Sequence, residues 1–256
     1  MTVASTLIAG TQGQELAGQT VVIIGGSSGI GLATARAVRA AGGDVVLTGR
    51  NRDRLAAAAE QTEPLGTAAF DATDDDALAA FFEGLETPVD HVMVSAGGSY
   101  YAPLAEIDFE RARREVDEHV WLAFAVARHA VGRVRAGGTL LFMHGTGARR
   151  PGIGLGVAAA ITAAMPAVAA NLALELAPVR VNLIAAGFVD TPLSARLLGE
   201  ELDARRAQLR EHLPIGRVVG PGDVAALALH LMTNTALTGA TYDIDGGQQL
   251  VAGAGA

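Results

Sequence analysis

The fold is decided by one stretch, Val21-Val22-Ile23-Ile24-Gly25-Gly26-Ser27-Ser28-Gly29-Ile30-Gly31, an apolar run followed at once by glycines. β-Branched residues favour a buried strand, and glycines in the next turn let the backbone approach a pyrophosphate closely. A helix that begins there points unpaired N–H groups and its positive dipole end at the anion. The stretch therefore predicts a dinucleotide site, and a purely structural glycine turn is the less favoured interpretation.

The rest of the chain alternates short β-branched runs with longer alanine-rich helical patterns, which is typical of βαβ units that build a parallel sheet. We expect strands at 20–25, 44–48, 66–70, 90–94, 138–143, 179–184 and 240–243. We expect helices at 29–41, 51–62, 74–85, 105–116, 117–135, 155–177 and 222–233.

The predicted fold class is therefore α/β, a Rossmann-type doubly wound parallel sheet of about seven strands with helices on both faces. Residues 1–256 are expected to form a single dinucleotide-binding domain, in which residues 1–18 are an N-terminal extension. The segment 188–215 is polar, charged and helix-prone, and it interrupts the alternation. We expect this segment to form a lid over the strand ends on the substrate side.

Composition and charge exclude several classes of function. The formal net charge of −8 disfavours nucleic acid and anionic lipid as partners, because both attract clustered basic charge. Zero cysteines exclude disulfides, thiolate catalysis and cysteine-bound metal, and no other metal site is expected. The opening residues 1–5 carry no basic residue of the kind a secretory signal has, so we expect a cytoplasmic location.

One apolar segment, Leu155 to Ala170, raises the question of a membrane span. It is shorter than the ~20 residues that a bilayer requires, and it consists mostly of alanine. Asn171 and Glu175 follow in the same helical pattern. We therefore expect a buried helix of the domain, bent but not broken at Pro166.

The end of the second expected strand bears on the choice of cofactor. An acidic side chain at Gly49 would hold the ribose hydroxyls of NAD, and here Gly49 is followed by Arg50, with Arg52 close by. Arginine suits a 2′-phosphate. The favoured cofactor is therefore NADP(H), with NAD(H) as the alternative, and the other interpretation of Arg50 is a solvated cap.

Further motifs identify a family. Beside the glycine stretch stand Asp71-Ala72-Thr73-Asp74, Ser95-Ala96-Gly97, the segment 186–192 (Ala-Gly-Phe-Val-Asp-Thr-Pro) and Asp245-Gly246-Gly247. With these motifs, from Gln19 to Leu250, the chain resembles the short-chain dehydrogenase/reductases. The resemblance implies a small-molecule substrate and a homodimer or homotetramer. The cofactor-binding residues that it implies, together with those argued above, are Gly25, Ser27, Ser28, Gly29, Ile30, Gly31, Arg50, Asp71, Ala96, Gly97, Gly187, Val189 and Thr191.

The same resemblance implies carbonyl–alcohol chemistry with a tyrosine as proton donor, a lysine four residues later, a serine and an asparagine. Counted back from Glu175, the tyrosine position falls on Ala158 and the lysine position on Thr162. The serine position falls on Gly145 and the asparagine position on His119, and the chain contains no lysine at all. The usual proton transfer is therefore not expected here.

Other side chains are candidates for the missing proton donor. His144 and His119 fall at or beside the vacated positions, and an imidazole that titrates near neutrality can donate a proton to a developing alkoxide. The alternative is that both histidines are ordinary hydrogen-bonded groups. Tyr100 and Tyr101 follow a glycine loop on the expected substrate side, where Tyr101 is the third catalytic candidate and packing is the alternative. The pair Arg149-Arg150 could meet an anionic substrate or be solvated.

Two functions stay open. The first is an NADP(H)-dependent oxidoreductase that acts on a carbonyl or alcohol with a non-standard proton donor. The second is a catalytically silent NADP(H)-binding sensor or scaffold, since function resides in the site and not in the fold. The resemblance continues through the segment expected beside the nicotinamide, which favours the oxidoreductase.

Overall fold

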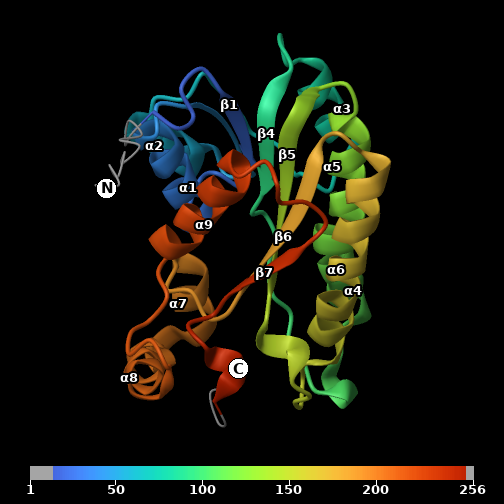
Figure 1. Cartoon of the computed structure of the whole chain (residues 1–256). Helices are drawn as coiled ribbons and strands as arrows, with labels where there is room; N and C mark the ends of the chain where they lie inside the picture. Colours follow the sequence, from blue (N-terminus) through green and yellow to red (C-terminus); the bar gives the residue numbers. More distant parts are fainter. Residues whose placement is uncertain (1–13, 252–256) are drawn as a thin grey trace, which may run out of the picture.

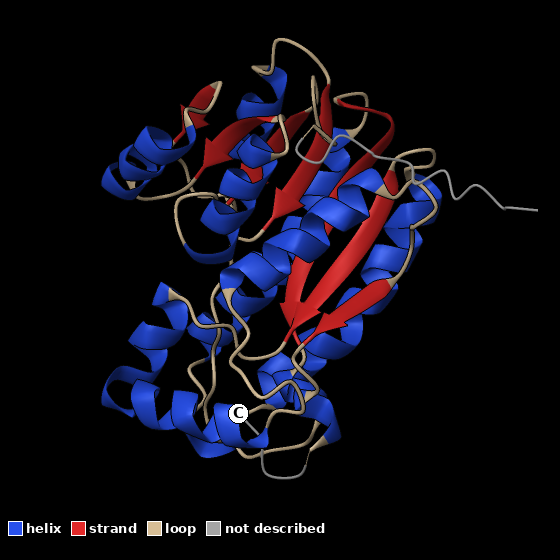
Figure 2. Ribbon diagram, turned by 60° about the vertical axis from the view of Figure 1, so that its left-hand side comes forward, coloured by secondary structure: helices blue, strands red, loops and turns tan. Residues whose placement is uncertain are grey.

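A computed structural model describes residues 14–251 as one parallel sheet with helices on both faces (Figure 1, Figure 2). The strands are β1 (Thr20–Ile24), β2 (Asp44–Thr48), β3 (Gly66–Ala68), β4 (Val89–Val94), β5 (Val134–Gly145), β6 (Arg180–Ala186) and β7 (Thr241–Ile244). Their order is β3-β2-β1-β4-β5-β6-β7, and every neighbouring pair is parallel. The chain winds outward from β1 in one direction and, after β4, in the other, which confirms the doubly wound prediction.

The helices alternate with the strands. They are α1 (Gly29–Ala40), α2 (Arg52–Thr62), α3 (Asp75–Glu83), α4 (Phe109–Val116), α5 (Leu122–Ala130), α6 (Gly156–Glu175), α7 (Pro192–Leu198), α8 (Leu202–His212) and α9 (Pro221–Thr233). Shorter turns are η1 (Leu104–Glu106), η2 (Asp117–Trp121), η3 (Gly147–Arg149), η4 (Gly199–Glu201) and η5 (Gln248–Leu250). Figure 1 places α1, α2 and α9 against one face of the sheet and α3, α5 and α6 against the other.

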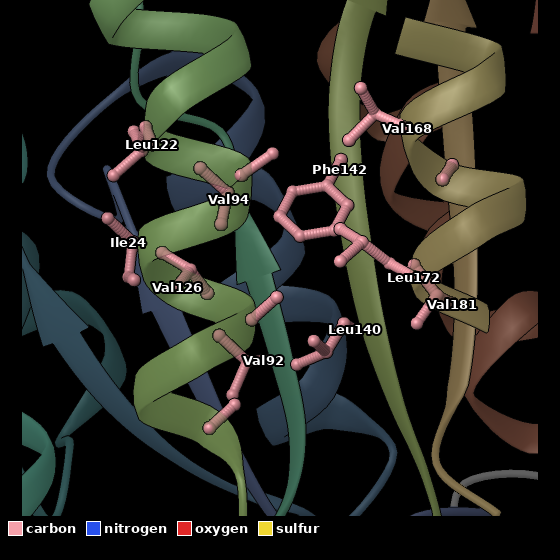
Figure 3. Packing of buried hydrophobic residues seen from close by; sticks show 14 of the residues in the cluster. Ile24, Val92, Val94, Leu122, Val126, Leu140, Phe142, Val168, Leu172 and Val181 are labelled. Carbon is pink, nitrogen blue, oxygen red and sulfur yellow. The ribbon is translucent and has the colours of Figure 1, made fainter. Parts of the chain in front are cut away.

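Alternation along the strands divides the core into two layers. In β1, Val22 and Ile24 belong to the layer under α5 and α6, whereas Val21 and Ile23 belong to the layer under α1 and α9. Figure 3 shows Leu140 and Phe142 of β5 in the first layer, in the space that α5 and α6 cover. Because both faces of each central strand are buried, the strands appear in the sequence as continuous apolar runs.

The helical region after β4 differs from the prediction. The expected helices 105–116 and 117–135 form one continuous helical segment, in which the π-helical turn η2 joins α4 to α5. The segment ends before Gly132, whose φ of +73° does not continue a helix, and β5 begins at Val134. A π turn is uncommon and is found frequently at functional sites.

The apolar helix α6 runs unbroken through Pro166, as predicted. Among the described residues it is the one helix whose length and composition would allow it to cross a membrane, a test that core helices also pass. Its buried residues recur at helical spacing along one side, against β6 and the core. We therefore interpret α6 as a helix that packs on one face of the sheet. The opposite side stays open in the single chain, since Leu174 is 80% exposed.

The structure describes part of the expected N-terminal extension and all of the segment 188–215. Residues 1–13 of the expected N-terminal extension lie outside the described residues. Leu16, in contrast, is fully buried, and its N–H donates to the Ala41 carbonyl at 3.0 Å, so residues 14–18 pack onto the domain. The segment 188–215 is helical, as predicted, and forms α7, η4 and α8.

Candidate active site

The first of two adjoining cavities lies at the carboxyl ends of β1, β2 and β4, where the winding direction reverses. It is lined by the glycine turn after β1, by Gly49 and Arg50 after β2, and by Ser95, Ala96 and Gly97 after β4. A Cβ on Gly25, which has a φ of +93°, would lie 2.6 Å from the Ala96 nitrogen, so a side chain here would push the two turns apart. α1 begins at Gly29 without a side-chain cap, which leaves its first N–H groups available to an anion.

Arg50 stands at the rim of this first cavity. Its guanidinium lies 3.3 Å from Glu118 and 3.7 Å from Asp71, and its side chain is 60% exposed. Although burial acts to raise the pKa of Asp71, hydrogen bonds from Thr73 and the charge of Arg50 lower it below its ordinary value. Asn51 and not Arg50 caps α2, since its side chain accepts from the Arg54 N–H. Arg50 therefore faces the nucleotide cavity and is not the helix cap.

The second cavity continues from the first. Residues that line both are Ile30, Ser95, Ala96, Gly97, Thr191 and Leu193. Its remaining wall comes from the end of β5, the turn η2, the start of α6 and the segment after β6. A cofactor bound along the first cavity would therefore extend its far end into the second.

His144 lies in this second cavity, at the end of β5. Its Nε2 is 2.7 Å from the Oγ1 of Thr162 on α6. Burial, followed by the charge of His119, lowers the pKa of His144 to about 4, against a hydrogen bond to the Ala158 carbonyl that raises it. At neutral pH the ring is therefore uncharged, and the expectation that His144 titrates near neutrality is not met. Its one N–H is shared between two resting partners, the Ala158 carbonyl and the Thr162 hydroxyl.

His119 comes from the π turn and meets His144 edge to face. The two ring centroids are 5.1 Å apart at an interplanar angle of 80°. Nδ1 of His119 donates to the backbone carbonyl of Glu115 at 2.9 Å, so Nε2 is the acceptor in the neutral ring. A Cβ on Gly97 would lie 3.0 Å from this Nε2, which shows how closely the turn after β4 packs on the imidazole.

Glu115 also lines the second cavity, and sequence reasoning missed it. Its side chain is 8% exposed, and its carboxylate lies 3.8 Å from Nδ1 of His119. Burial raises the pKa of Glu115 and the nearby Glu118 adds to the rise, whereas His119 acts in the opposite direction. The available signal was spacing, because Glu115 precedes His119 by four residues and so shares its helix face.

The structure separates the two neighbouring tyrosines. Tyr101 lines the second cavity with 51% of its surface exposed. Tyr100 is buried, and its hydroxyl accepts the backbone N–H of Asp108 at 2.6 Å. Of the pair considered as phenol donors, Tyr100 is therefore a packing residue, and the expectation that it could face the substrate is wrong.

Most of the remaining predicted site residues line the second cavity. Gly145, Ala158 and Thr162 line the second cavity, as do Gly187 and Val189. Gly31 lines neither cavity, because its role is packing: a Cβ there would lie 2.4 Å from the Gly25 carbonyl oxygen.

The arginine pair that could have met an anionic substrate is engaged elsewhere. Arg149 forms a two-pronged ion pair with Asp243, and Arg150 donates to the carbonyl of Val251 at 2.6 Å. Neither residue lines the second cavity. An anion site built from this pair is therefore not supported.

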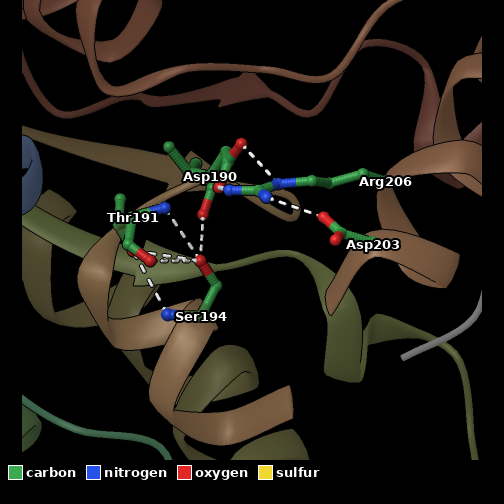
Figure 4. A network of polar contacts seen from close by, with 6 residues as sticks. Asp190, Thr191, Ser194, Asp203 and Arg206 are labelled. Atoms are coloured by element: carbon green, nitrogen blue, oxygen red, sulfur yellow. Dashed lines mark hydrogen bonds and ion pairs between the residues drawn. The ribbon is translucent and has the colours of Figure 1, made fainter. Parts of the chain in front are cut away.

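Polar contacts among residues 190–206 hold the segment after β6 in place (Figure 4). Arg206 of α8 donates to both carboxylate oxygens of Asp190, at 2.9 and 2.8 Å, and to Asp203 at 2.9 Å. Thr191 and Ser194 form a reciprocal capping box at the start of α7. These contacts fix the position from which Thr191 and Leu193 reach both cavities.

Comparisons with known proteins agree with this geometry. A family model described as enoyl-(acyl carrier protein) reductase matches residues 24–249. The chain is 30% identical to 3beta-hydroxysteroid dehydrogenase 1 of Eggerthella lenta, over 93% of this chain and 97% of that protein. Among solved structures, a small-chain dehydrogenase in complex with NADPH is 28% identical with a TM-score of 0.78, over 91% of this chain and 99% of that one. The MalC reductase/Diels-Alderase of Malbranchea aurantiaca shares the fold with a TM-score of 0.86 at 24% identity, over 93% and 99% of the two chains.

Proposed function

Because the chain belongs to the short-chain dehydrogenase/reductase family of oxidoreductases, we propose that it is an NADP(H)-dependent enzyme that interconverts a carbonyl and an alcohol, with His144 as proton donor. The observation that carries the proposal is the hydrogen-bonded pair His144–Thr162 in a cavity continuous with the nucleotide cleft. The cytoplasmic location and the homodimer or homotetramer stay predictions from the sequence.

The cofactor proposal rests on the first cavity. Its glycine turn leaves room for a pyrophosphate beside the start of α1, and Gly49 and Arg50 suit a 2′-phosphate better than ribose hydroxyls. One structural neighbour binds NADPH. When bound, the reduced cofactor supplies a hydride; NAD(H) is the alternative.

The proton-donor proposal rests on the second cavity. Ala158 has no proton to give, and the Thr162 hydroxyl is not acidic enough to replace a phenol. In the free protein His144 is a neutral imidazole. Negative charge that develops on a carbonyl oxygen beside it would favour the protonated ring, which can give a proton to that oxygen. Thr162 orients the ring, and His119 lies against it as the second imidazole of the site.

The test separates the proposed enzyme from a silent nucleotide sensor. Purified protein is titrated with NADPH and NADH by nicotinamide fluorescence, and turnover is then followed by absorbance against a panel of ketones, aldehydes and quinones. His144→Ala is expected to lower kcat by roughly 10²–10⁴ while NADPH affinity stays within about twofold. His230→Ala, on the far helix α9, is the matched control. Binding without turnover on any substrate would favour the sensor, and no nicotinamide binding would reject both functions.

A further inference from the structure

The reaction proposed above makes no use of Glu115, although its carboxylate lies in the reacting cavity. Its Oε2 is beside the turn after β4, where a Cβ on Gly98 would approach it to 3.9 Å, and its side chain is 8% exposed. Removing a carboxylate from water is costly unless a positive partner replaces the lost hydration. The structure therefore raises the question of which cation Glu115 serves.

The protein itself offers little positive charge at this point. Among residues 14–251, His119 is the only basic side chain within 4.0 Å of the carboxylate, and its Nδ1 proton is already donated to the Glu115 backbone carbonyl. Arg111 lies over the Tyr100 ring at 4.9 Å, and Arg50 is paired with Glu118 and Asp71. The carboxylate accepts the Tyr100 backbone N–H, and His119 and Arg111 act on it as positive groups, but neither forms a close ion pair with it. A cationic ligand in the second cavity would add that close positive partner.

A second, independent observation concerns protons. The positions expected to hold the tyrosine and the lysine carry Ala158 and Thr162, neither of which is an acid at neutral pH. A neutral carbonyl needs a proton when hydride reaches its carbon, because the oxygen becomes an alkoxide. A substrate that already carries its positive charge needs none.

We propose that the second cavity also reduces iminium ions, with the Glu115 carboxylate binding the positive charge of the C=N⁺ group. A bound reduced nicotinamide would supply the hydride that adds to the carbon and would itself be oxidised. The π pair of the C=N bond would become the lone pair of the amine nitrogen. No proton is transferred. The inference rests on the nicotinamide site of the proposed function but not on His144 as an acid.

The groups around Glu115 agree with selection of a cation. Glu118 faces it from the next turn of the same helical segment, and His119, Arg111 and the Tyr100 backbone N–H are the counteracting groups. Burial raises the pKa of Glu115, and a cation bound beside the carboxylate would act in the opposite direction, as His119 does. The ligand class is therefore an organic cation, and an anionic substrate is disfavoured.

The kinetic test compares a permanently charged iminium ion with a neutral ketone of the same shape. NADPH oxidation is followed with N-methyl-3,4-dihydroisoquinolinium and with 1-tetralone. Glu115→Gln is expected to lower kcat/KM for the iminium roughly 30-fold or more and for the ketone less than about threefold. Glu115→Asp, which keeps the charge, should recover part of the loss. Glu110→Gln, exposed on the same helix α4, is the matched control.

A binding test does not depend on turnover. Isothermal calorimetry of the NADP⁺ complex with N,N-dimethyl-1,2,3,4-tetrahydroisoquinolinium should show an affinity at least about tenfold above that of a neutral isostere. If Glu115→Gln fails to fold, this measurement on the unaltered protein still tests whether the second cavity prefers a cation, and equal affinity for the neutral isostere would overturn the proposal.

The outcomes are distinguishable. Ketone turnover without iminium reduction, or equal losses for both substrates in Glu115→Gln, would overturn the iminium proposal alone. Iminium reduction without ketone turnover would support it and overturn the carbonyl function. Failure to bind any nicotinamide would overturn both.

Discussion

The two halves of the cleft are built from different material. The nucleotide half consists mainly of backbone, namely glycine turns that meet after β1 and β4 and the open start of α1. The reacting half consists of side chains from three separate elements, namely Glu115 and His119 of the α4–η2 segment, His144 of β5 and Thr162 of α6. A site made of backbone changes only if the turn itself changes, whereas a site made of side chains can be rebuilt on an unchanged fold.

The strongest test of this contrast is a single methyl group in the nucleotide half. Gly31→Ala would place a Cβ 2.4 Å from the Gly25 carbonyl oxygen and 2.5 Å from the Ser95 hydroxyl, so the turn must move. We expect NADPH affinity, measured by fluorescence titration, to fall by about 10³-fold or more, or roughly 4 kcal/mol. Gly66→Ala, where nothing lies within 4 Å of the added Cβ, is the control. Unchanged affinity in Gly31→Ala would show that the turn is not a backbone cradle.

The next test compares a buried core histidine, His91, with the half-buried His144 of the reacting half. His91 of β4 is 3% exposed, bonds to Gln19 at 2.7 Å, and burial lowers its pKa to about 4, as it does for His144. Because these folded-state pKa values lie below the ordinary 6.5, the unfolded chain binds more protons between pH 6.5 and 4. The stability linked to each histidine is thus complete above pH 6.5 and lost as the pH falls toward 4.

His91→Gln should therefore remove about 2 kcal/mol of the stability lost between pH 7 and pH 5, measured by urea unfolding. Its turnover at pH 7 should equal that of the unaltered protein. Gln fits the same partner, so gross loss of packing is not expected. The same acid sensitivity in His91→Gln, or a fall in turnover as large as that of His144→Ala, would contradict the division between a core histidine and a site histidine.

The smallest expected effect concerns Arg50, the basic side chain that the sequence analysis assigned to the nucleotide half. Arg50→Ala should reduce the preference for NADPH over NADH by about tenfold, or ~1.4 kcal/mol, because an exposed arginine contacts a phosphate through solvent-screened charge. Arg52→Ala is the neighbouring control, since its side chain does not line the cavity. The measurement is the dissociation constant of each variant for NADPH and for NADH. An equal loss of affinity for both nucleotides would show that Arg50 does not distinguish the cofactors.

The fold was predictable because its signals are local. All seven expected strands are present, although β5 begins at Val134, four residues before its expected start. The family assignment from Gly25 to Gly31 and from Asp245 to Gly247 is confirmed. The exceptions also have a local cause. The helices expected to separate at 116/117 are joined by a π turn, which has no strong pattern in the sequence.

The sequence by itself determined the sheet, the glycine turns and the place of the nucleotide, because apolar periodicity and glycine backbone freedom act over a few residues. The tertiary structure alone decided which side chains meet in the reacting half. It brought His144 against His119 and Thr162 and paired Arg149 with Asp243. These neighbours come from packing between elements far apart in the chain, and no local pattern encodes the distance between them.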